Sequence, residues 1–254
     1  MIDMRGYFIQ PEYQNSINTF NASYNNTECD EYWVIFTRLQ QAISNNKCPI
    51  CEVELTNSPN NANTATLDHF RPKDQNMYPH LKCKPENYIL MCSLCNSTYK
   101  ENKFPLFDES KRATHALTVP QTSAEQPLLF NPTEKDPLDF FELAFRQTEQ
   151  GGILELKRKR TIQKKSYEYQ ICQTMITTFG LGYCSTYPHP NNNAKTCRID
   201  ILTKHYTTFV AFAKEIEKGD KKSLALFLKN TNRIEELKKY GFFNFMIKKQ
   251  FKVQ

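Results

Sequence analysis

Four cysteines in this sequence occur as two pairs with the spacing of metal ligands. Cys48 and Cys51 form one C-x2-C pair, and Cys92 and Cys95 form a second, with 40 residues (52–91) between them. Thiolates bind zinc well, and four of them close a tetrahedral site that leaves no position open for a substrate. The spacing therefore predicts a structural zinc site that joins two distant segments. The interval is longer than a compact zinc ribbon needs, which indicates an insertion between the two pairs.

The insertion contains an acid next to a histidine, Asp68 and His69, in the segment TLDHFRPK. A neutral imidazole can take a proton from water, and an adjacent carboxylate can hold a hard divalent cation. β-Branched residues lead into the pair and Pro72 follows it, so we expect a strand within 64–72 that ends near His69. Alone, an Asp-His pair is weak evidence, because most such pairs are structural.

Polar residues after the second cysteine pair extend this pattern. A helix that begins near Asn96 would place Asn96, Lys100 and Lys103 on one face, at positions i, i+4 and i+7. An amide oxygen and two ammonium groups on one face suit a metal ion beside a phosphodiester. Arg71 and Lys73 follow the Asp-His pair and are further candidates for phosphate contacts. For Arg71 and Lys100 in particular, the competing interpretation is a structural ion pair.

The order C-x2-C, Asp68-His69, Asn87, C-x2-C-Asn96 and then Lys100 resembles the HNH nuclease family, whose core is a ββα-metal fold. The resemblance implies that His69 activates water and that Asp68 is a metal ligand. It also implies that Asn87 braces the loop through backbone hydrogen bonds. Asn96 stands where the family often has histidine, and it would supply a metal-ligating oxygen. Two oxygen ligands favour Mg²⁺ or Mn²⁺ over a softer ion.

The resemblance also implies a mechanism and a substrate. One metal ion would bind Asp68, Asn96 and a phosphate oxygen, while His69 accepts a proton from the attacking water. The metal would stabilise the leaving 3′-oxygen, so the products would carry a 5′-phosphate and a 3′-hydroxyl. We expect the substrate to be DNA, held by salt-sensitive contacts with little sequence preference. The candidate nucleic-acid-binding residues are Arg71, Lys73, Lys100 and Lys103.

A narrower resemblance covers roughly residues 47–145. The segments LDHFRPKDQNMYPHL, NYILMCSLCNSTYKENKFPLFD and QPLLFNPTEKDPLDFFEL are similar to the HNH subunit of Septu anti-phage systems (PtuB-like proteins), including the retron-associated versions. The sequence departs from that pattern before Asn87, where KCKPEN stands in place of a common aromatic residue. The resemblance implies an effector nuclease controlled by an ABC/SMC-like ATPase (PtuA-like). In a retron-associated system, the reverse transcriptase and its msDNA would join the same complex.

Hydrophobic periodicity predicts the elements that position these residues. Helical spacing of apolar residues occurs within 30–46, and two apolar runs flank Gln150-Gly151-Gly152 as in a β-hairpin. Residues 1–27 are expected to be largely loop with a short ordered piece, and 87–103 to be a short loop, a knuckle and a helix. We expect an α+β fold, with a ββα-metal (HNH) core held by a four-cysteine zinc site and a mainly helical C-terminal region. The expected divisions are an N-terminal helical segment (1–46), the nuclease core with its zinc knuckles (47–110), a loop and β-hairpin extension (111–160) and a basic helical region (161–254).

Charge is divided unevenly along the 254 residues, whose net charge is +6. Residues 1–150 hold 13 Lys and Arg against 19 Asp and Glu, whereas residues 151–254 hold 20 against 8. The second part is therefore a candidate surface for nucleic acid or a partner protein, although solvated helix faces explain the charge equally well. A helical stripe of apolar residues there, from Leu202 to Ile216, could bind a partner or form internal core.

The sequence also indicates a cytoplasmic location. It has no apolar run of about 18 residues and no signal-peptide pattern at its start, so we expect no membrane association. Cytosolic thiols stay reduced, so disulfide bonds are not expected. The remaining cysteines are predicted to be small buried or half-buried residues: Cys29, Cys83, Cys172, Cys184 and Cys197.

Two other classes of function fit part of the pattern. The first is a stand-alone HNH nuclease of the restriction or toxin type, and co-purification with an ATPase would distinguish it from the Septu-like interpretation. The second is a non-catalytic, zinc-held nucleic-acid-binding module. That alternative uses the cysteines but gives no reason for Asp68, His69 and Asn96 to occur together. Metal-dependent nicking of DNA would exclude it.

Overall fold

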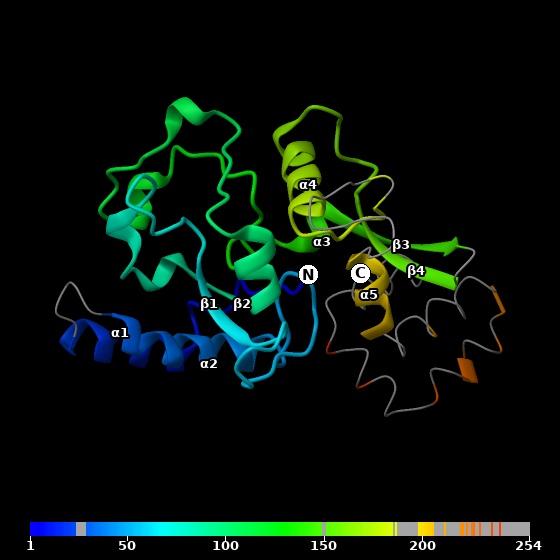
Figure 1. Cartoon of the computed structure of the whole chain (residues 1–254), viewed down its shortest axis with the longest axis horizontal. Helices are drawn as coiled ribbons and strands as arrows, with labels where there is room; N and C mark the ends of the chain where they lie inside the picture. The colour runs from blue at the N-terminus through cyan, green and yellow to red at the C-terminus, as the bar shows by residue number, and fades with distance from the viewer. Residues whose placement is uncertain are drawn as a thin grey trace.

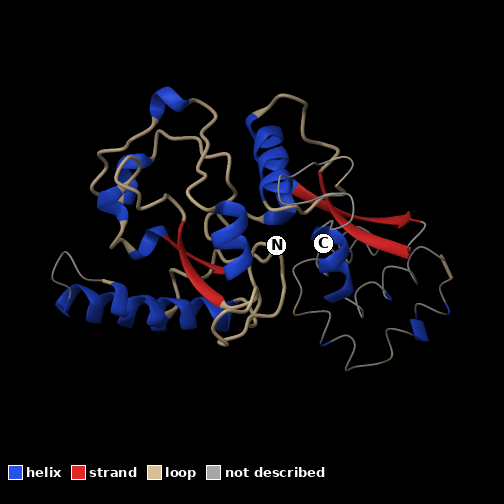
Figure 2. Cartoon of the chain, in the orientation of Figure 1, coloured by secondary structure: helices blue, strands red, loops and turns tan. Residues whose placement is uncertain are grey.

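The computed structural model describes residues 1–23, 29–148, 151–184, 186 and 198–205, with isolated residues beyond. The protein is α+β, with small two-stranded sheets among its helices (Figure 2). The helices are α1 (Pro11–Ser23), α2 (Trp33–Ile43), α3 (Pro137–Phe140), α4 (Tyr167–Thr178) and α5 (Arg198–His205). The strands are β1 (Ala65–His69), β2 (Tyr88–Cys92), β3 (Phe141–Thr148) and β4 (Gly151–Arg158). In the described residues, no helix combines the length and apolar character needed to cross a bilayer.

Helix α2 packs against the β1–β2 sheet, on the side of the molecule that also carries α1 (Figure 1). Phe36 and Gln40 are the buried residues of this helix. The Gln40 side chain donates to the Tyr88 carbonyl at 3.1 Å and accepts from the Leu90 amide at 2.7 Å. One side chain thus satisfies two backbone groups of β2, which would otherwise be buried without partners. The helix within 30–46 is confirmed, and it ends before Asn46, whose φ is 56°.

The β1–β2 sheet is antiparallel and pairs Asp68 with Ile89 and His69 with Tyr88. The segment Tyr88–Cys92 is therefore a strand, and the expectation of a loop before the second knuckle is wrong. All five of its residues are buried, so the strand lacks the alternation that reveals a half-buried strand in a sequence. A wide, π-type helical turn, Leu94–Lys100, follows it directly.

The second sheet lies with α3, α4 and α5 on the other side of the molecule (Figure 1). It is the predicted β-hairpin, with Thr148 opposite Gly151, and residues 149–150 between the strands are not described. At the N-terminus, α1 is a helix of 13 residues, longer than the short ordered piece expected within residues 1–27. The part of the predicted apolar stripe beyond residue 205 lies outside the continuously described residues.

The prediction that the protein has no disulfide bonds is wrong. Cys29 and Cys83 form a disulfide bond that closes a sequence separation of 54 residues. Both belong to a small, mainly aromatic core that also contains residues of α1, α2 and β2. Cys172 is a buried free thiol, as predicted, and Cys184 is disulfide-bonded, whereas Cys197 lies outside the described residues.

Candidate functional site

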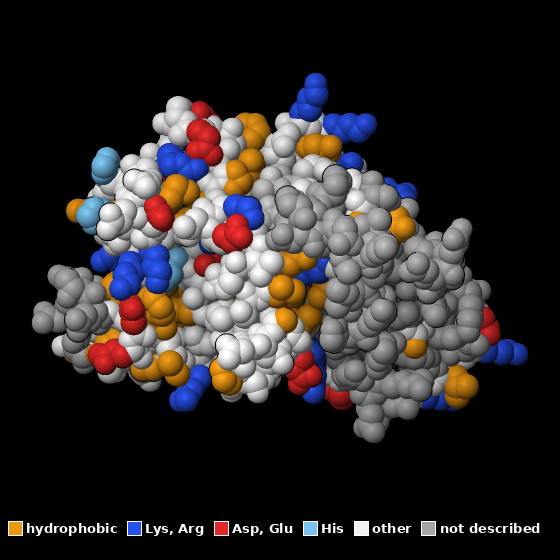
Figure 3. Space-filling model, in the orientation of Figure 1, with side chains coloured by type: hydrophobic (Ala, Val, Ile, Leu, Met, Phe, Trp, Pro, Cys, Tyr) orange, Lys and Arg blue, Asp and Glu red, His pale blue; other side chains and the backbone are white. Residues whose placement is uncertain are grey.

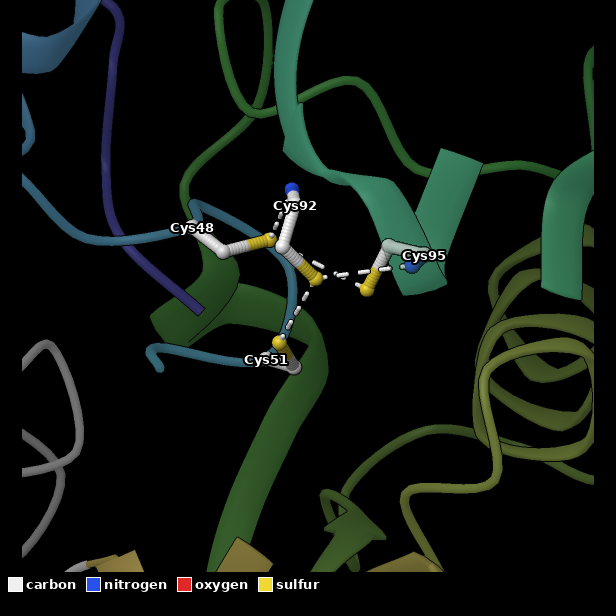
Figure 4. Close-up of side chains that lie close together, drawn as sticks. All are labelled: Cys48, Cys51, Cys92 and Cys95. Atoms are coloured by element: carbon white, nitrogen blue, oxygen red, sulfur yellow. Dashed lines mark hydrogen bonds between the residues drawn. The ribbon is translucent and has the colours of Figure 1, made fainter. Parts of the chain in front are cut away.

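The two cysteine pairs meet in one buried cluster. Cys48 and Cys51 come from the turn after α2, Cys92 ends β2, and Cys95 lies in the following helical turn. Figure 4 shows the four side chains pointing toward one another from these separate segments. The Sγ atoms of Cys48 and Cys95 are 3.8 Å apart, and those of Cys51 and Cys92 are 3.7 Å apart. All four sulfur atoms lie within 4.8 Å of one another.

These distances fit a tetrahedral zinc site. With Zn–S bonds of about 2.3 Å, tetrahedral geometry places neighbouring sulfur atoms about 3.8 Å apart. The backbone supports the arrangement, because the amide of Cys92 donates to Cys48 Sγ at 3.3 Å and the amide of Cys95 donates to Cys92 Sγ at 3.4 Å. Amide donors of this kind stabilise metal-bound thiolates. The cluster can therefore hold zinc with all four positions filled by protein.

Arg198, the first residue of α5, also contacts the cluster. Its Nη2 donates to Cys95 Sγ at 3.0 Å, and its guanidinium lies 4.0 Å from the centre of the Tyr99 ring. Burial alone would lower the pKa of Arg198, but the thiolates beside it outweigh that effect and raise the pKa. A zinc ion with four thiolates carries two negative charges, which this buried cation partly offsets. Sequence inspection missed Arg198, because 103 residues separate it from Cys95.

Asp68 and Asn96 lie on the same side of β1. Thr66 and Asp68 are two residues apart, so their side chains leave the strand on one face. Asn96 Nδ2 donates to Thr66 Oγ1 at 3.1 Å, and Lys100 Nζ lies 2.8 Å from Asp68 Oδ2. The helical turn therefore runs along the strand and brings Asn96 and Lys100 to the face that carries Asp68. Burial raises the pKa of Asp68, and Lys100 opposes that rise.

His69 leaves β1 on the opposite face, toward α2. Its ring contacts the edges of Trp33 and Tyr88, with centroids 5.3 Å and 5.2 Å away. Its Nε2 lies 2.7 Å from the carbonyl oxygen of Lys82, and a carbonyl can only accept, so Nε2 carries the proton. Burial lowers the pKa of His69 to about 4. The imidazole is thus neutral at pH 7, with the lone pair on Nδ1.

Asn87 connects the end of the strand to the loop that follows it. Its Oδ1 accepts from the amide of Arg71 at 2.8 Å, and its Nδ2 donates to the carbonyl of Arg71 at 2.9 Å. The same Nδ2 lies 3.3 Å from the carbonyl oxygen of Leu81. One buried amide therefore fixes the chain on both sides of the segment that holds Lys82 against His69.

Three of the four predicted phosphate-binding residues make internal contacts. The Arg71 guanidinium pairs with the buried Glu125 carboxylate at 2.9 Å, and Lys100 is fully buried against Asp68 and the His69 carbonyl. These two contacts match the ion-pair interpretation of Arg71 and Lys100. Lys103 does not share a helical face with Asn96, because the helical turn ends at Lys100, and its ammonium pairs instead with the neighbouring Glu101.

Lys73 behaves differently from the other three. Its ammonium lies 4.1 Å from the centre of the Trp33 ring, and no carboxylate of the described residues forms an ion pair with it. The sequence pattern gave no sign of this contact, because the partner ring comes from helix α2. Lys73 is exposed, so its ammonium can meet a ligand from solvent.

Comparison with known proteins gives one informative relative. The chain is similar to the Septu protein PtuB of Bacillus mycoides (strain KBAB4). The two are 32% identical over 139 residues, which is 50% of this chain and 43% of the relative. This match confirms the resemblance to PtuB-like proteins, and the chain covers less than half the length of that relative. No family model matches the chain, and no solved structure matches it.

Proposed function

We propose that this protein is a metal-dependent endonuclease of the HNH type that cleaves DNA and serves as the effector of an anti-phage defence system. The observation that carries the proposal is the state of His69. A neutral imidazole, fixed through Nε2 and carrying its lone pair on Nδ1, lies one residue after a buried carboxylate at the end of a strand. A neutral imidazole with a lone pair on one nitrogen is the state that a general base for hydrolysis requires.

The surroundings of His69 suit the acceptance of a proton. The Lys82 carbonyl selects the tautomer and fixes the ring, and it stabilises the imidazolium that forms when Nδ1 takes a proton. In the protein alone, burial keeps the pKa of His69 at about 4, which makes it a weak base. A bound phosphodiester brings negative charge close to the ring, and that charge raises the pKa toward the value that catalysis needs.

Asp68 and Asn96 are the residues we propose to hold the catalytic metal ion. A carboxylate oxygen and an amide oxygen are ligands that Mg²⁺ and Mn²⁺ accept, and both ions keep several water ligands besides those of the protein. The Asn96 amide donates to Thr66 through Nδ2, and within the described part of the chain no donor is bonded to its Oδ1. When bound, the metal would supply charge stabilisation at the phosphate and the leaving oxygen. Asn87 acts as a positioning residue for the adjoining loop.

The Asp68–Lys100 ion pair favours a second candidate function, a zinc-held nucleic-acid-binding module without catalysis. Lys100 already neutralises the carboxylate that a metal ion would bind. In the nuclease proposal, Lys100 shares Asp68 with the metal ion, and its contact with the His69 carbonyl keeps it in place. The two functions differ in whether added Mg²⁺ or Mn²⁺ supports DNA cleavage.

The proposed role in defence rests on the similarity to a Septu protein PtuB. A PtuA-like ATPase of the ABC/SMC type is the proposed partner, and the basic region over 161–254 is the proposed contact surface. The division of the chain at 1–46, 47–110 and 111–160 is part of the same proposal. In a retron-associated system, the reverse transcriptase and its msDNA would belong to the complex, which we place in the cytoplasm.

A cleavage assay with matched variants tests the nuclease proposal. Supercoiled plasmid is incubated with the protein in Mg²⁺ or Mn²⁺, with and without the candidate ATPase and ATP. His69→Ala and Asn96→Ala should abolish nicking while the circular dichroism spectrum is kept. His115→Ala, at an exposed histidine, should cleave as the wild type does. Normal cleavage by His69→Ala, or no cleavage by the wild type under any of these conditions, would refute the proposal.

A further inference from the structure

Trp33 brings helix α2 into contact with the proposed catalytic base. It is the first residue of that helix, outside the β1–β2 core, and the edge contact between its ring and His69 spans 5.3 Å between centroids. The indole Nε1 is buried and donates no hydrogen bond to any described residue. Trp33 therefore borders the imidazole without being fixed by a polar contact of its own.

Two lysines share the Trp33 ring. Lys73 Nζ lies 4.1 Å from its centroid and Lys82 Nζ lies 5.9 Å from it. Lys82 is the residue whose carbonyl accepts from His69, so its side chain starts from the loop that touches the imidazole. Basic side chains gather beside a histidine over the N-terminal helices on the face drawn in Figure 3. Two ammonium groups thus lie at one aromatic ring next to the proposed base.

Of the two ammonium groups at the Trp33 ring, only that of Lys82 has an ion-pair partner among the described residues. Lys82 pairs with Asp30 at 2.9 Å, but no acidic residue of the described chain forms an ion pair with Lys73. Asp30 is the acidic residue that acts most strongly on Lys73, but its carboxylate is paired with Lys82. Asp68 is paired with Lys100. Two like charges held at one ring repel each other, and an anion between them would relieve the repulsion. A phosphate group fits this need, because both ammonium groups can donate to its oxygen atoms.

We propose that Trp33, Lys73 and Lys82 form a binding site for a phosphate group of the nucleic-acid substrate, next to the phosphate that is cleaved. This inference rests on the proposed nuclease function, and it adds Trp33 and Lys82 to the nucleic-acid-binding residues expected from the sequence. Trp33 acts as a positioning residue, because its ring holds the Lys73 ammonium beside His69. Substrate binding therefore depends on helix α2 as well as on the β1–β2 core.

Trp33 is the sole tryptophan of the chain, so the tryptophan fluorescence of the protein reports directly on this phosphate-binding site. The full-length protein is titrated with a short mixed-sequence DNA duplex, without added divalent metal so that no cleavage occurs. Binding should change the Trp33 emission, and inorganic phosphate should compete. Lys73→Met and Lys82→Met should each reduce the salt dependence of binding by about one phosphate contact. Lys84→Met, two residues from Lys82, is the matched control and should bind as the wild type does.

Steady-state kinetics of DNA cleavage distinguish a positioning role of these residues from a general effect on folding. Lys73→Met and Lys82→Met should raise KM for DNA about tenfold, as expected for the loss of a charge-assisted hydrogen bond, with little change in kcat. Trp33→Leu should raise KM by a similar factor, whereas Trp33→Phe, which keeps an aromatic face for Lys73, should largely restore it. If Trp33→Leu fails to fold, as judged by circular dichroism, the comparison of Trp33→Phe with the lysine variants remains decisive.

The outcomes distinguish this inference from the proposed function. In one outcome, the wild type cleaves DNA while Lys73→Met and Lys82→Met keep its KM and its salt dependence. That result would refute the proposed phosphate-binding site and leave the nuclease proposal intact. A change in emission with DNA that inorganic phosphate does not reverse would overturn the phosphate assignment. If the wild type does not cleave DNA, the nuclease proposal fails, and the titration still decides whether DNA binds at Trp33.

Discussion

Protonation of His69 should make the stability of this protein depend on pH. The folded chain holds the imidazole neutral, because burial lowers its pKa from 6.5 to about 4. In the unfolded chain the same group takes up its proton near pH 6.5. Between pH 6.5 and 4 the unfolded state therefore binds more protons, so the free energy of unfolding falls as the pH falls. Above pH 6.5 both states are neutral and the contribution is constant.

The size of the effect follows from the difference between the two pKa values. Each pH unit corresponds to about 1.4 kcal/mol, so a pKa that falls from 6.5 to about 4 corresponds to about 3 kcal/mol. His69 is only 5% exposed, so solvent does little to reduce this figure. The hydrogen bond to the Lys82 carbonyl acts in the opposite direction, since it favours the charged ring, but burial is the larger effect.

The measurement compares three proteins by urea unfolding at several pH values between 7 and 4, without added Mg²⁺. His69→Gln keeps an amide that can donate to the Lys82 carbonyl but removes the titration. The wild type should lose about 3 kcal/mol more than His69→Gln across this range. His115→Gln, at an exposed histidine, should lose as much as the wild type. Cysteine and carboxylate protonation affects all three proteins, so the difference between them isolates His69.

Equal losses of stability in the wild type and His69→Gln would refute this reasoning. Such a result would mean that the imidazole is solvated or charged in the folded protein, and the assignment of Nδ1 as a free acceptor would fail with it. A larger loss in His69→Gln than in the wild type would mean that the folded pKa is raised rather than lowered.

Three further predictions concern contacts that hold the fold. Arg71→Met should lower the free energy of unfolding by about 3–5 kcal/mol, because it leaves the Glu125 carboxylate buried without its cation. Unchanged urea unfolding together with weaker DNA binding would instead support a phosphate contact for Arg71. Cys51→Ser should reduce bound zinc in metal analysis and lower the unfolding temperature and the activity together, whereas full zinc content would contradict the four-thiolate site. Reduction of the Cys29–Cys83 disulfide, which spans 54 residues, should cost up to about 4 kcal/mol on the chain-entropy model. Identical unfolding curves with and without a thiol reductant would show that the bond does not stabilise the protein.

Several parts of this protein could be predicted because their signals are local. The two cysteine pairs are recognised by residue type and spacing, and the structure brings their sulfur atoms within 4.8 Å. The hairpin of β3 and β4 follows from two apolar runs around Gly151 and Gly152, and α2 from its helical spacing. In each case, neighbours in the sequence determine the backbone conformation.

The roles of the charged residues could not be predicted in the same way. Arg71 and Lys100 follow the proposed catalytic residues at spacings that suit phosphate contacts, yet the fold buries both against carboxylates. The burial of a residue depends on which segments pack against it, and Glu125, the partner of Arg71, lies 54 residues away in the sequence. Strand β2 was missed for a related reason, since a strand covered on both faces shows no alternation.

The sequence by itself determined which side chains could carry chemistry: four thiolates that could hold a structural metal, and the Asp-His-Asn set that we propose for hydrolysis. Only the tertiary structure decided how those groups are held. It placed Lys100 on Asp68, Arg198 on Cys95 and Trp33 beside His69. Residue type and short spacing fix which atoms can react, but protonation, charge balance and access depend on contacts between segments far apart in the chain.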